Sequence, residues 1–214
     1  MDTISVVIIV LTYMGSTVLV LLHFLSSAYK NLDEAKKLKN KTNEVLSHCT
    51  KLVEHEISNK IFYIVKDFVK DFLESREEIT KEFEFKVKEE DLEELRFLAD
   101  LSADLKELPD LMFEYETRIS NSILQGKKLT ILVLFLNALI AVFLLGLLQG
   151  PFFYLLLALL VAYIFVEGID FRYAIFVAPK SNLELEEMLE KLKSSKNVRE
   201  IEKKVNEVFR VVET

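Results

Sequence analysis

The chain is poor in the residues that interrupt helices and in those that build common reactive sites. It has one cysteine, three prolines, five glycines and no tryptophan among 214 residues. With Cys49 alone, an intramolecular disulfide is excluded. The scattered glycines form no phosphate-binding loop, and a His-Glu-x-x-His zinc motif is missing. We therefore expect no enzyme, no cofactor and no small-molecule substrate.

Charged residues are missing from three long apolar runs. These runs are Ile4–Ala28, Leu129–Gln149 and Phe152–Val166. About 18 apolar residues suffice for a helix that crosses the roughly 30 Å hydrocarbon core of a bilayer. The third run is shorter, and the residues that follow it to Ala178 extend it toward the headgroup region. The runs predict a multi-pass membrane protein with three spans.

The first run has two interpretations, a retained anchor and a cleaved signal peptide. Ser26-Ser27-Ala28 resembles a cleavage site with small residues. The residues before the run carry no positive charge, however, and the run is too long for the apolar part of a signal peptide. We expect a retained anchor.

The basic residues beside the runs predict the orientation in a cell membrane. Lys30 and four further lysines up to Lys41 follow the first run, and Lys127 and Lys128 precede the second. Such lysines favour the cytoplasmic side, which puts the insert and the C-terminus in the cytoplasm and the N-terminus outside.

Between Asp71 and Lys127, seventeen acidic residues outnumber eight basic ones, which excludes a nucleic-acid partner.

The charged insert between the first two runs predicts helices. No glycine or proline occurs from Lys30 to Leu108, and apolar residues recur at spacings of three and four up to Leu73. A helix that begins in the first run and continues through Leu73 is therefore expected. A capping box at Ser75 and an alternating segment, Glu82–Lys88, predict a turn and an extended connector.

The second half of the insert and the tail predict further helices. One begins near Asp91 and is interrupted at Pro109, and another runs from Asp110 to Gly126. In the tail, a capped helix begins at Ser181. The pair Ser194-Ser195 separates it from a last helix, whose apolar face carries Val198, Ile201, Val205, Val208 and Val212.

The expected fold is all-α, with three membrane helices and a cytoplasmic, coiled-coil-like helical bundle. The predicted domains are a first transmembrane helix (1–28), a cytoplasmic helical domain (29–127), a transmembrane hairpin (128–178) and a cytoplasmic helical tail (179–214).

Polar residues inside the runs are the candidate site. Several of them share one face of the first span, and others lie in the second and third spans. The candidate intramembrane cluster is Ser5, Thr12, Ser16, His23, Asn137 and Glu167. Ionisable residues at membrane depth are expensive and often functional. The alternatives are ordinary helix packing through hydroxyls and a histidine and a glutamate that reach the interface. His48 and His55, seven residues apart, are interpreted as solvated rather than as metal ligands.

The order of the segments resembles two families of membrane proteins. A span, a long cytoplasmic helical insert, a span hairpin and a tail also form the core of YidC-type insertases and their Get/EMC relatives. That resemblance implies a polar groove that receives a client segment, but no span here contains an arginine. The same order is similar to that of ExbB/TolQ/MotA stators, whose spans are richer in small residues around an ion pore.

Three roles follow from these patterns. The first is a non-enzymatic scaffold or accessory subunit whose cytoplasmic helices bind a protein partner or a second copy. The alternatives are membrane-protein insertion through a polar groove in the first span, and an ion-driven stator component.

Overall fold

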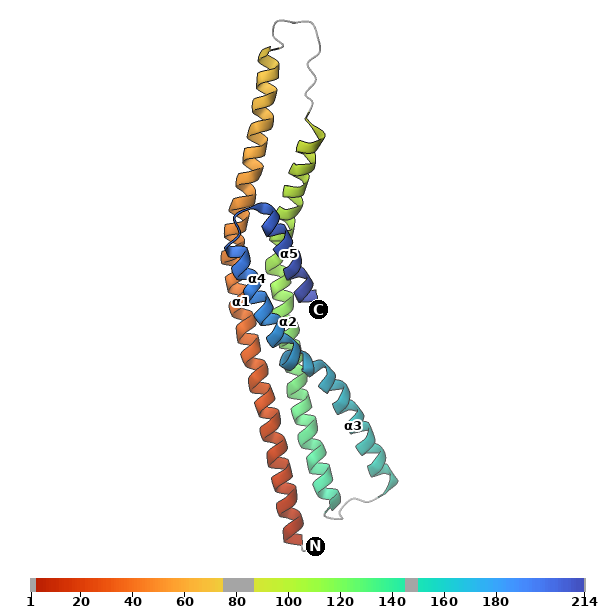
Figure 1. Ribbon diagram of the computed structural model, residues 1–214. Helices are drawn as coiled ribbons and strands as arrows, with labels where there is room; N and C mark the ends of the chain where they lie inside the picture. The colour runs from red at the N-terminus through yellow and green to blue at the C-terminus, as the bar shows by residue number, and fades with distance from the viewer. Residues whose placement is uncertain (1–2, 75–86, 145–149, 214) are drawn as a thin grey trace. The chain divides into compact units, whose positions relative to one another are not determined.

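A computed structural model describes residues 3–74, 87–144 and 150–213, and its elements are all helical within these ranges (Figure 1). The helices are α1 (Thr3–Glu74), α2 (Glu89–Leu144), α3 (Pro151–Arg172), the π-helix η2 (Tyr173–Val177), α4 (Ala178–Lys193) and α5 (Val198–Glu213). The predicted all-α fold is confirmed. The expected capping box at Ser75 and most of the expected connector lie outside the described residues.

Three helical stretches are long and apolar enough to cross a membrane, as the uncharged runs predict. Their apolar side chains are mostly exposed. Leu19 in α1 is 69% exposed and Phe165 in α3 is 71% exposed. A helix that shows large apolar side chains all round matches a lipid environment better than water.

Helix α1 runs without a break from the first apolar run into the charged insert, as the lack of glycine and proline predicts. Its buried positions are spaced alternately by three and four residues over most of their length. They are Ala28, Asn31, Ala35, Leu38, Thr42, Val45, Cys49 and Val53. An average spacing of 3.5 residues between buried positions keeps one face of a helix against its neighbours along its length.

Helix α2 corrects the expected interruption at Pro109, because the helix continues through this residue. A proline inside a helix removes one backbone hydrogen bond and costs about 3 kcal/mol. The buried seam runs unchanged across it at spacings of three and four. It comprises Leu98, Leu101, Leu105, Leu108, Met112, Tyr115, Ile119, Ser122, Gly126 and Leu129. Burial of the leucines on both sides of Pro109 offsets the lost bond.

Helices α3, η2 and α4 follow one another without an intervening loop. The expectation that a separate helix begins at Ser181 is therefore wrong. The expected break at Ser194-Ser195 is confirmed, since α4 ends at Lys193 and α5 begins at Val198. The predicted apolar face of α5 is buried at Ile201, Val205, Val208 and Val212.

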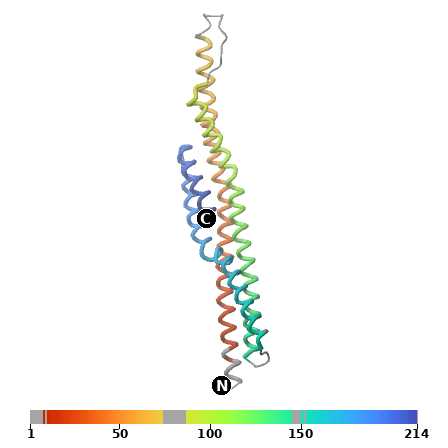
Figure 2. Tube along the Cα trace, turned by 90° about the vertical axis from the view of Figure 1, so that its right-hand side faces the viewer, coloured from red at the N-terminus to blue at the C-terminus, as the bar shows by residue number. Residues whose placement is uncertain are grey.

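The chain divides into two compact units. Unit 1 comprises residues 1–37 and 113–183, and unit 2 comprises 38–112 and 184–214. In unit 1, Figure 1 shows α2 between α1 and α3, and Figure 2 again shows α1 running alongside α2. Each unit contains part of the predicted domain 29–127, whose boundaries stay a prediction.

In unit 2, α4 packs against α1. The Cys49 thiol lies 3.8 Å from the Leu192 carbonyl oxygen, and the Lys193 ammonium lies 2.7 Å from the Glu44 carboxylate. Cys49 is fully buried, and burial raises the pKa of its thiol to about 11. The single cysteine is therefore a core residue with a protonated thiol at neutral pH.

Close packing in unit 1 requires a glycine where α2 meets the end of α3. A Cβ atom added at Gly126 would overlap the ring of Phe171, whose side chain is buried. No such obstacle exists at Gly168, where an added Cβ would meet nothing within 4 Å. The two glycines thus differ in packing and share a helical backbone.

We expect Gly126→Ala to lower the free energy of unfolding by ~1–3 kcal/mol, because overpacking of a close contact outweighs the ~1 kcal/mol that alanine gains in helix propensity. Thermal unfolding in detergent, followed by far-UV circular dichroism, measures the effect. Gly168→Ala is the matched control and should leave stability unchanged or slightly raised. Equal shifts for both variants would contradict the steric argument.

Candidate functional site

Four buried polar side chains form a hydrogen-bonded network around η2 in unit 1. This polar network consists of Asn31 from α1, Tyr115 and Ser122 from α2, and Asn182 from α4. Each of the four is at most 5% exposed. π-helical turns inside helices are rare, and those that occur often lie at functional sites. η2 and its partners therefore form a candidate site.

The Ser122 hydroxyl takes the place of one backbone hydrogen bond at the start of η2. Its hydroxyl donates to the Asp170 carbonyl at 2.6 Å and accepts from the Ala174 amide at 3.1 Å. In a continuous α-helix the Ala174 amide would donate to the Asp170 carbonyl directly. The serine therefore lies between the two groups, and insertion of a side chain into the ladder is a recognised cause of local helix distortion.

Asn31 satisfies a carbonyl at the other end of the same turn. In η2 the Ala178 amide donates to the Tyr173 carbonyl, five residues back. The next donor in that pattern would be Pro179, which has no amide hydrogen. The Ala174 carbonyl that it would have served instead accepts from the Asn31 amide nitrogen at 2.8 Å.

Tyr115 and Asn182 close the network. The Tyr115 hydroxyl donates to the Asn182 side-chain oxygen at 2.8 Å, and the Asn182 nitrogen donates to the Asn31 carbonyl at 3.0 Å. Burial raises the pKa of the Tyr115 hydroxyl, which therefore stays protonated as a donor. The network joins α1, α2 and α4 with every partner satisfied, so its evident role is structural.

The hydroxyls predicted in the first span do not join this network. Thr12 and Ser16 are exposed, and they donate to the carbonyls of Ile8 and Tyr13 in their own helix at 2.8 and 2.9 Å. Ser5 lies in α1, but its side chain is outside the described part of the chain. The hydroxyls that the structure describes thus meet their hydrogen-bonding needs locally.

Asn137 and Glu167 are buried, at 3% and 7% exposure. The Asn137 Nδ2 and the Glu167 Oε2 have no hydrogen-bond partner among the described residues. His23 is exposed and stacks at a tilt beside Phe24.

Two contacts between helices indicate the levels of His23, Asn137 and Glu167 along α2. Lys127 lies over the Tyr29 ring, and the Phe143 and Phe153 rings stack at 4.9 Å, which aligns α1 and α3 with α2. Counted along the helices from these contacts, Glu167, His23 and Asn137 lie at levels of α2 that are about four residues apart, an axial rise of about 6 Å each. The three residues are therefore staggered by about one turn, and the predicted cluster stays a prediction.

Sequence reasoning missed the polar network, although a signal was present. Asn31 and Ser122 occupy positions of the 3.5-residue seam that otherwise carry apolar side chains. A polar residue in such a seam often specifies how helices pair. Which backbone groups it contacts depends on η2, and nothing in the sequence indicates a π-helical turn.

The other two histidines also have partners, one distant in the sequence and one in the same helix. His48 lies 3.4 Å from the Ser195 carbonyl, and His55 pairs with Asn59 at 2.8 Å. Across residues 3–74, 87–144 and 150–213, no three His, Cys, Asp or Glu side chains are grouped so that they could hold a metal ion.

Comparison of the chain with family models, curated proteins and solved structures gives no match. Function is therefore inferred from the residues of this chain alone.

We expect Tyr115→Phe to lower the free energy of unfolding by ~1–3 kcal/mol, because it leaves the buried Asn182 oxygen without a donor. Tyr173→Phe is a matched control, since the Tyr173 hydroxyl lies beside the Arg118 guanidinium without a well-formed hydrogen bond in the described part of the chain. In detergent without added lipid, the control should leave stability unchanged or raise it. Thermal unfolding of both variants measures the difference, and a larger loss in Tyr173→Phe would contradict the network.

Proposed function

We propose that this protein is a multi-pass membrane protein that acts as a non-enzymatic scaffold or accessory subunit, and that unit 2 binds a protein partner. The lysines after the first run and before the second support a cytoplasmic insert and tail in a cell membrane, with the N-terminus outside. The exposed apolar stripe at the end of α1 carries the proposal. We define this stripe as Ile61, Phe62, Tyr63, Val65, Val69, Phe72 and Leu73.

The stripe differs from the apolar runs in its charge. Phe62 is 64% exposed and Leu73 is 57% exposed. Five charged residues lie between Ile57 and Leu73, and charged side chains at the centre of a bilayer are expensive. Large exposed apolar side chains in a segment too charged for lipid mark a surface for protein association.

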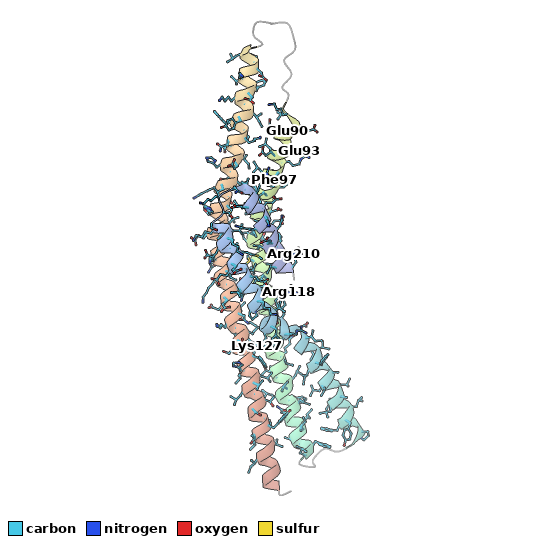
Figure 3. The ribbon with its side chains drawn as sticks, viewed as in Figure 1. Glu90, Glu93, Phe97, Arg118, Lys127 and Arg210 are labelled. Carbon is cyan, nitrogen blue, oxygen red and sulfur yellow. The ribbon has the colours of Figure 1, made fainter. Side chains whose placement is uncertain are left out.

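A groove in unit 2 indicates the chemistry of the partner. It has a volume of about 600 Å³ and lies between α1, α2 and α5. Tyr63, Phe97 and Leu98 supply apolar surface. Five glutamates line it against one lysine and one arginine, and that lysine, Lys60, is already paired with Asp91 at 2.8 Å. Figure 3 shows Glu90, Glu93 and Phe97 following one another along the start of α2. An apolar floor with an acidic rim fits an amphipathic helix that carries basic residues.

We expect a double variant, Phe62→Ala with Phe72→Ala, to lose at least about tenfold in partner recovery, because buried aromatic anchors contribute most of the binding energy at interfaces. The full chain is affinity-purified in mild detergent, and associated proteins are quantified by mass spectrometry.

Phe135→Ala with Phe165→Ala is the matched control for this experiment. These phenylalanines are also more than half exposed, but they lie in the uncharged runs. The control should keep the partner. Equal recovery with both double variants, or equal loss, would contradict binding through the stripe.

A second candidate, membrane-protein insertion, is favoured by the unpartnered polar atoms of Asn137 and Glu167. Buried polar groups without a partner are expensive, and water admitted through a groove would satisfy them. Photo-crosslinkers at Ser16 and His23 should then capture nascent apolar segments during synthesis, whereas crosslinkers at the lipid-exposed Leu19 should not. Absence of such adducts would exclude this candidate.

The stator alternative requires a stable ring of subunits, which native mass spectrometry would detect.

A further inference from the structure

A second pocket lies in unit 1, beside the turn that η2 makes. It has a volume of about 460 Å³ and lies between α2 and the α3–η2 junction. Its polar lining comes from Arg118, Asn121, Ser122, Gln125, Asp170, Arg172 and Tyr173. In Figure 3, Arg118 and Lys127 follow one another along the molecule. The pocket shares Ser122 with the polar network, but its charged side chains take no part in that network.

The charge of the pocket is positive. Two guanidinium groups, from Arg118 and Arg172, face a single carboxyl group, from Asp170. Within the described residues, neither guanidinium makes an ion pair with this carboxylate or with another one. The Arg118 guanidinium carbon lies 4.2 Å from the centre of the Tyr173 ring, an arrangement that holds the guanidinium at the pocket. Arginine binds phosphate through a planar fork of donors.

Two lining residues also carry unsatisfied polar atoms. The Gln125 Oε1 and the Tyr173 hydroxyl are shielded from solvent and make no hydrogen bond of acceptable geometry in the described part of the chain. Buried polar groups in folded proteins are nearly always paired. A polar ligand with an acceptor for the tyrosine and a donor for the amide oxygen would satisfy both once these two side chains turn toward the pocket.

The position of the pocket indicates where the ligand comes from. It lies at the end of the apolar segment of α3, and Lys127 and Lys128 lie just before the apolar run of α2. Such basic and aromatic residues are typical of the headgroup layer. Ile169, which lines the pocket, and Phe165, one turn earlier, are 57% and 71% exposed and could contact acyl chains. Basic pockets between spans on the cytoplasmic side are suited to anionic lipid headgroups.

We propose that the pocket formed by Arg118, Gln125, Arg172 and Tyr173 binds the phosphate group of an anionic phospholipid. The two guanidinium groups and the Tyr173 hydroxyl donate to the phosphate oxygens, and the Gln125 oxygen accepts from a hydroxyl or ammonium group of the headgroup. The inference rests on the membrane location in the proposed function. It does not depend on partner binding by unit 2.

Native mass spectrometry of the full chain tests this inference, with phosphatidylglycerol and phosphatidylcholine of the same acyl chains as probes. We expect phosphatidylglycerol to bind at least about tenfold more tightly. Arg172→Gln and Arg118→Gln should each weaken this binding about tenfold, and Tyr173→Phe should weaken it less. Arg118→Lys, which keeps the charge and loses the fork, should fall between Arg118→Gln and the unsubstituted chain.

The control is Arg96→Gln, which removes the same charge from an exposed position of α2 outside the pocket. It should leave phosphatidylglycerol binding unchanged. Equal binding of the two lipids, or an equal loss in Arg96→Gln, would overturn the proposal. Displacement of the lipid by millimolar inorganic phosphate, with no lipid preference left, would identify a free phosphate as the ligand and overturn the lipid assignment.

Failure of the inference can be told from failure of the proposed function. If the chain resists alkaline carbonate extraction from membranes but shows no preference for phosphatidylglycerol, only the lipid pocket is wrong. If carbonate releases the chain, the membrane location itself is wrong, and the pocket loses its source of lipid.

Discussion

Unit 1 depends on one hydroxyl group inserted into a helix. Ser122 takes the place of a backbone hydrogen bond between Asp170 and Ala174, and the helical run from α3 into α4 continues around it. Without this hydroxyl, the buried Ala174 amide would lose its partner, at a cost of about 1–3 kcal/mol, while the Asp170 carbonyl would keep the Tyr173 amide as a donor. Asn31 does the same for the carbonyl that Pro179 leaves without a donor. These two side chains tie α1 and α2 to a turn that otherwise could not be buried.

The fully paired network contrasts with the polar atoms that have no partner. Asn137, Glu167, Gln125 and Tyr173 each carry one such atom in unit 1. A packed protein satisfies nearly all its buried polar groups, so each unpaired atom calls for a partner such as water or a ligand. Gln125 and Tyr173 share a positively charged pocket, whereas Asn137 and Glu167 lie about two helical turns apart. The first pair therefore suggests a ligand site, and the second does not form one by itself.

The arrangement of helices could be read from the sequence, but the contacts between them could not. The uncharged runs and the missing glycine and proline indicate α1 as a continuous helix, and the valine pattern indicates the buried face of α5. Predictions from local sequence signals were wrong at two positions, the helix interruption expected at Pro109 and the helix start expected at Ser181. At Pro109, burial of neighbouring leucines outweighs the lost hydrogen bond. At Ser181, the helix had already begun, because side chains from α1 and α2 satisfy the groups that a loop would have exposed to water.

The exposed apolar surfaces of the two units call for different surroundings. In the uncharged runs, lipid can cover every side of a helix, because no charged group has to leave water. In the stripe between Ile61 and Leu73, lysines and aspartates alternate with phenylalanines and valines. Transfer of a single lysine or aspartate to the bilayer centre costs ~2.5–3.5 kcal/mol, while a phenylalanine or valine returns only ~0.3–0.6 kcal/mol. A protein surface resolves this conflict, since an interface buries apolar side chains at its centre and leaves charges at its wet rim. The amino-acid content of the stripe thus favours another helix over lipid as its partner.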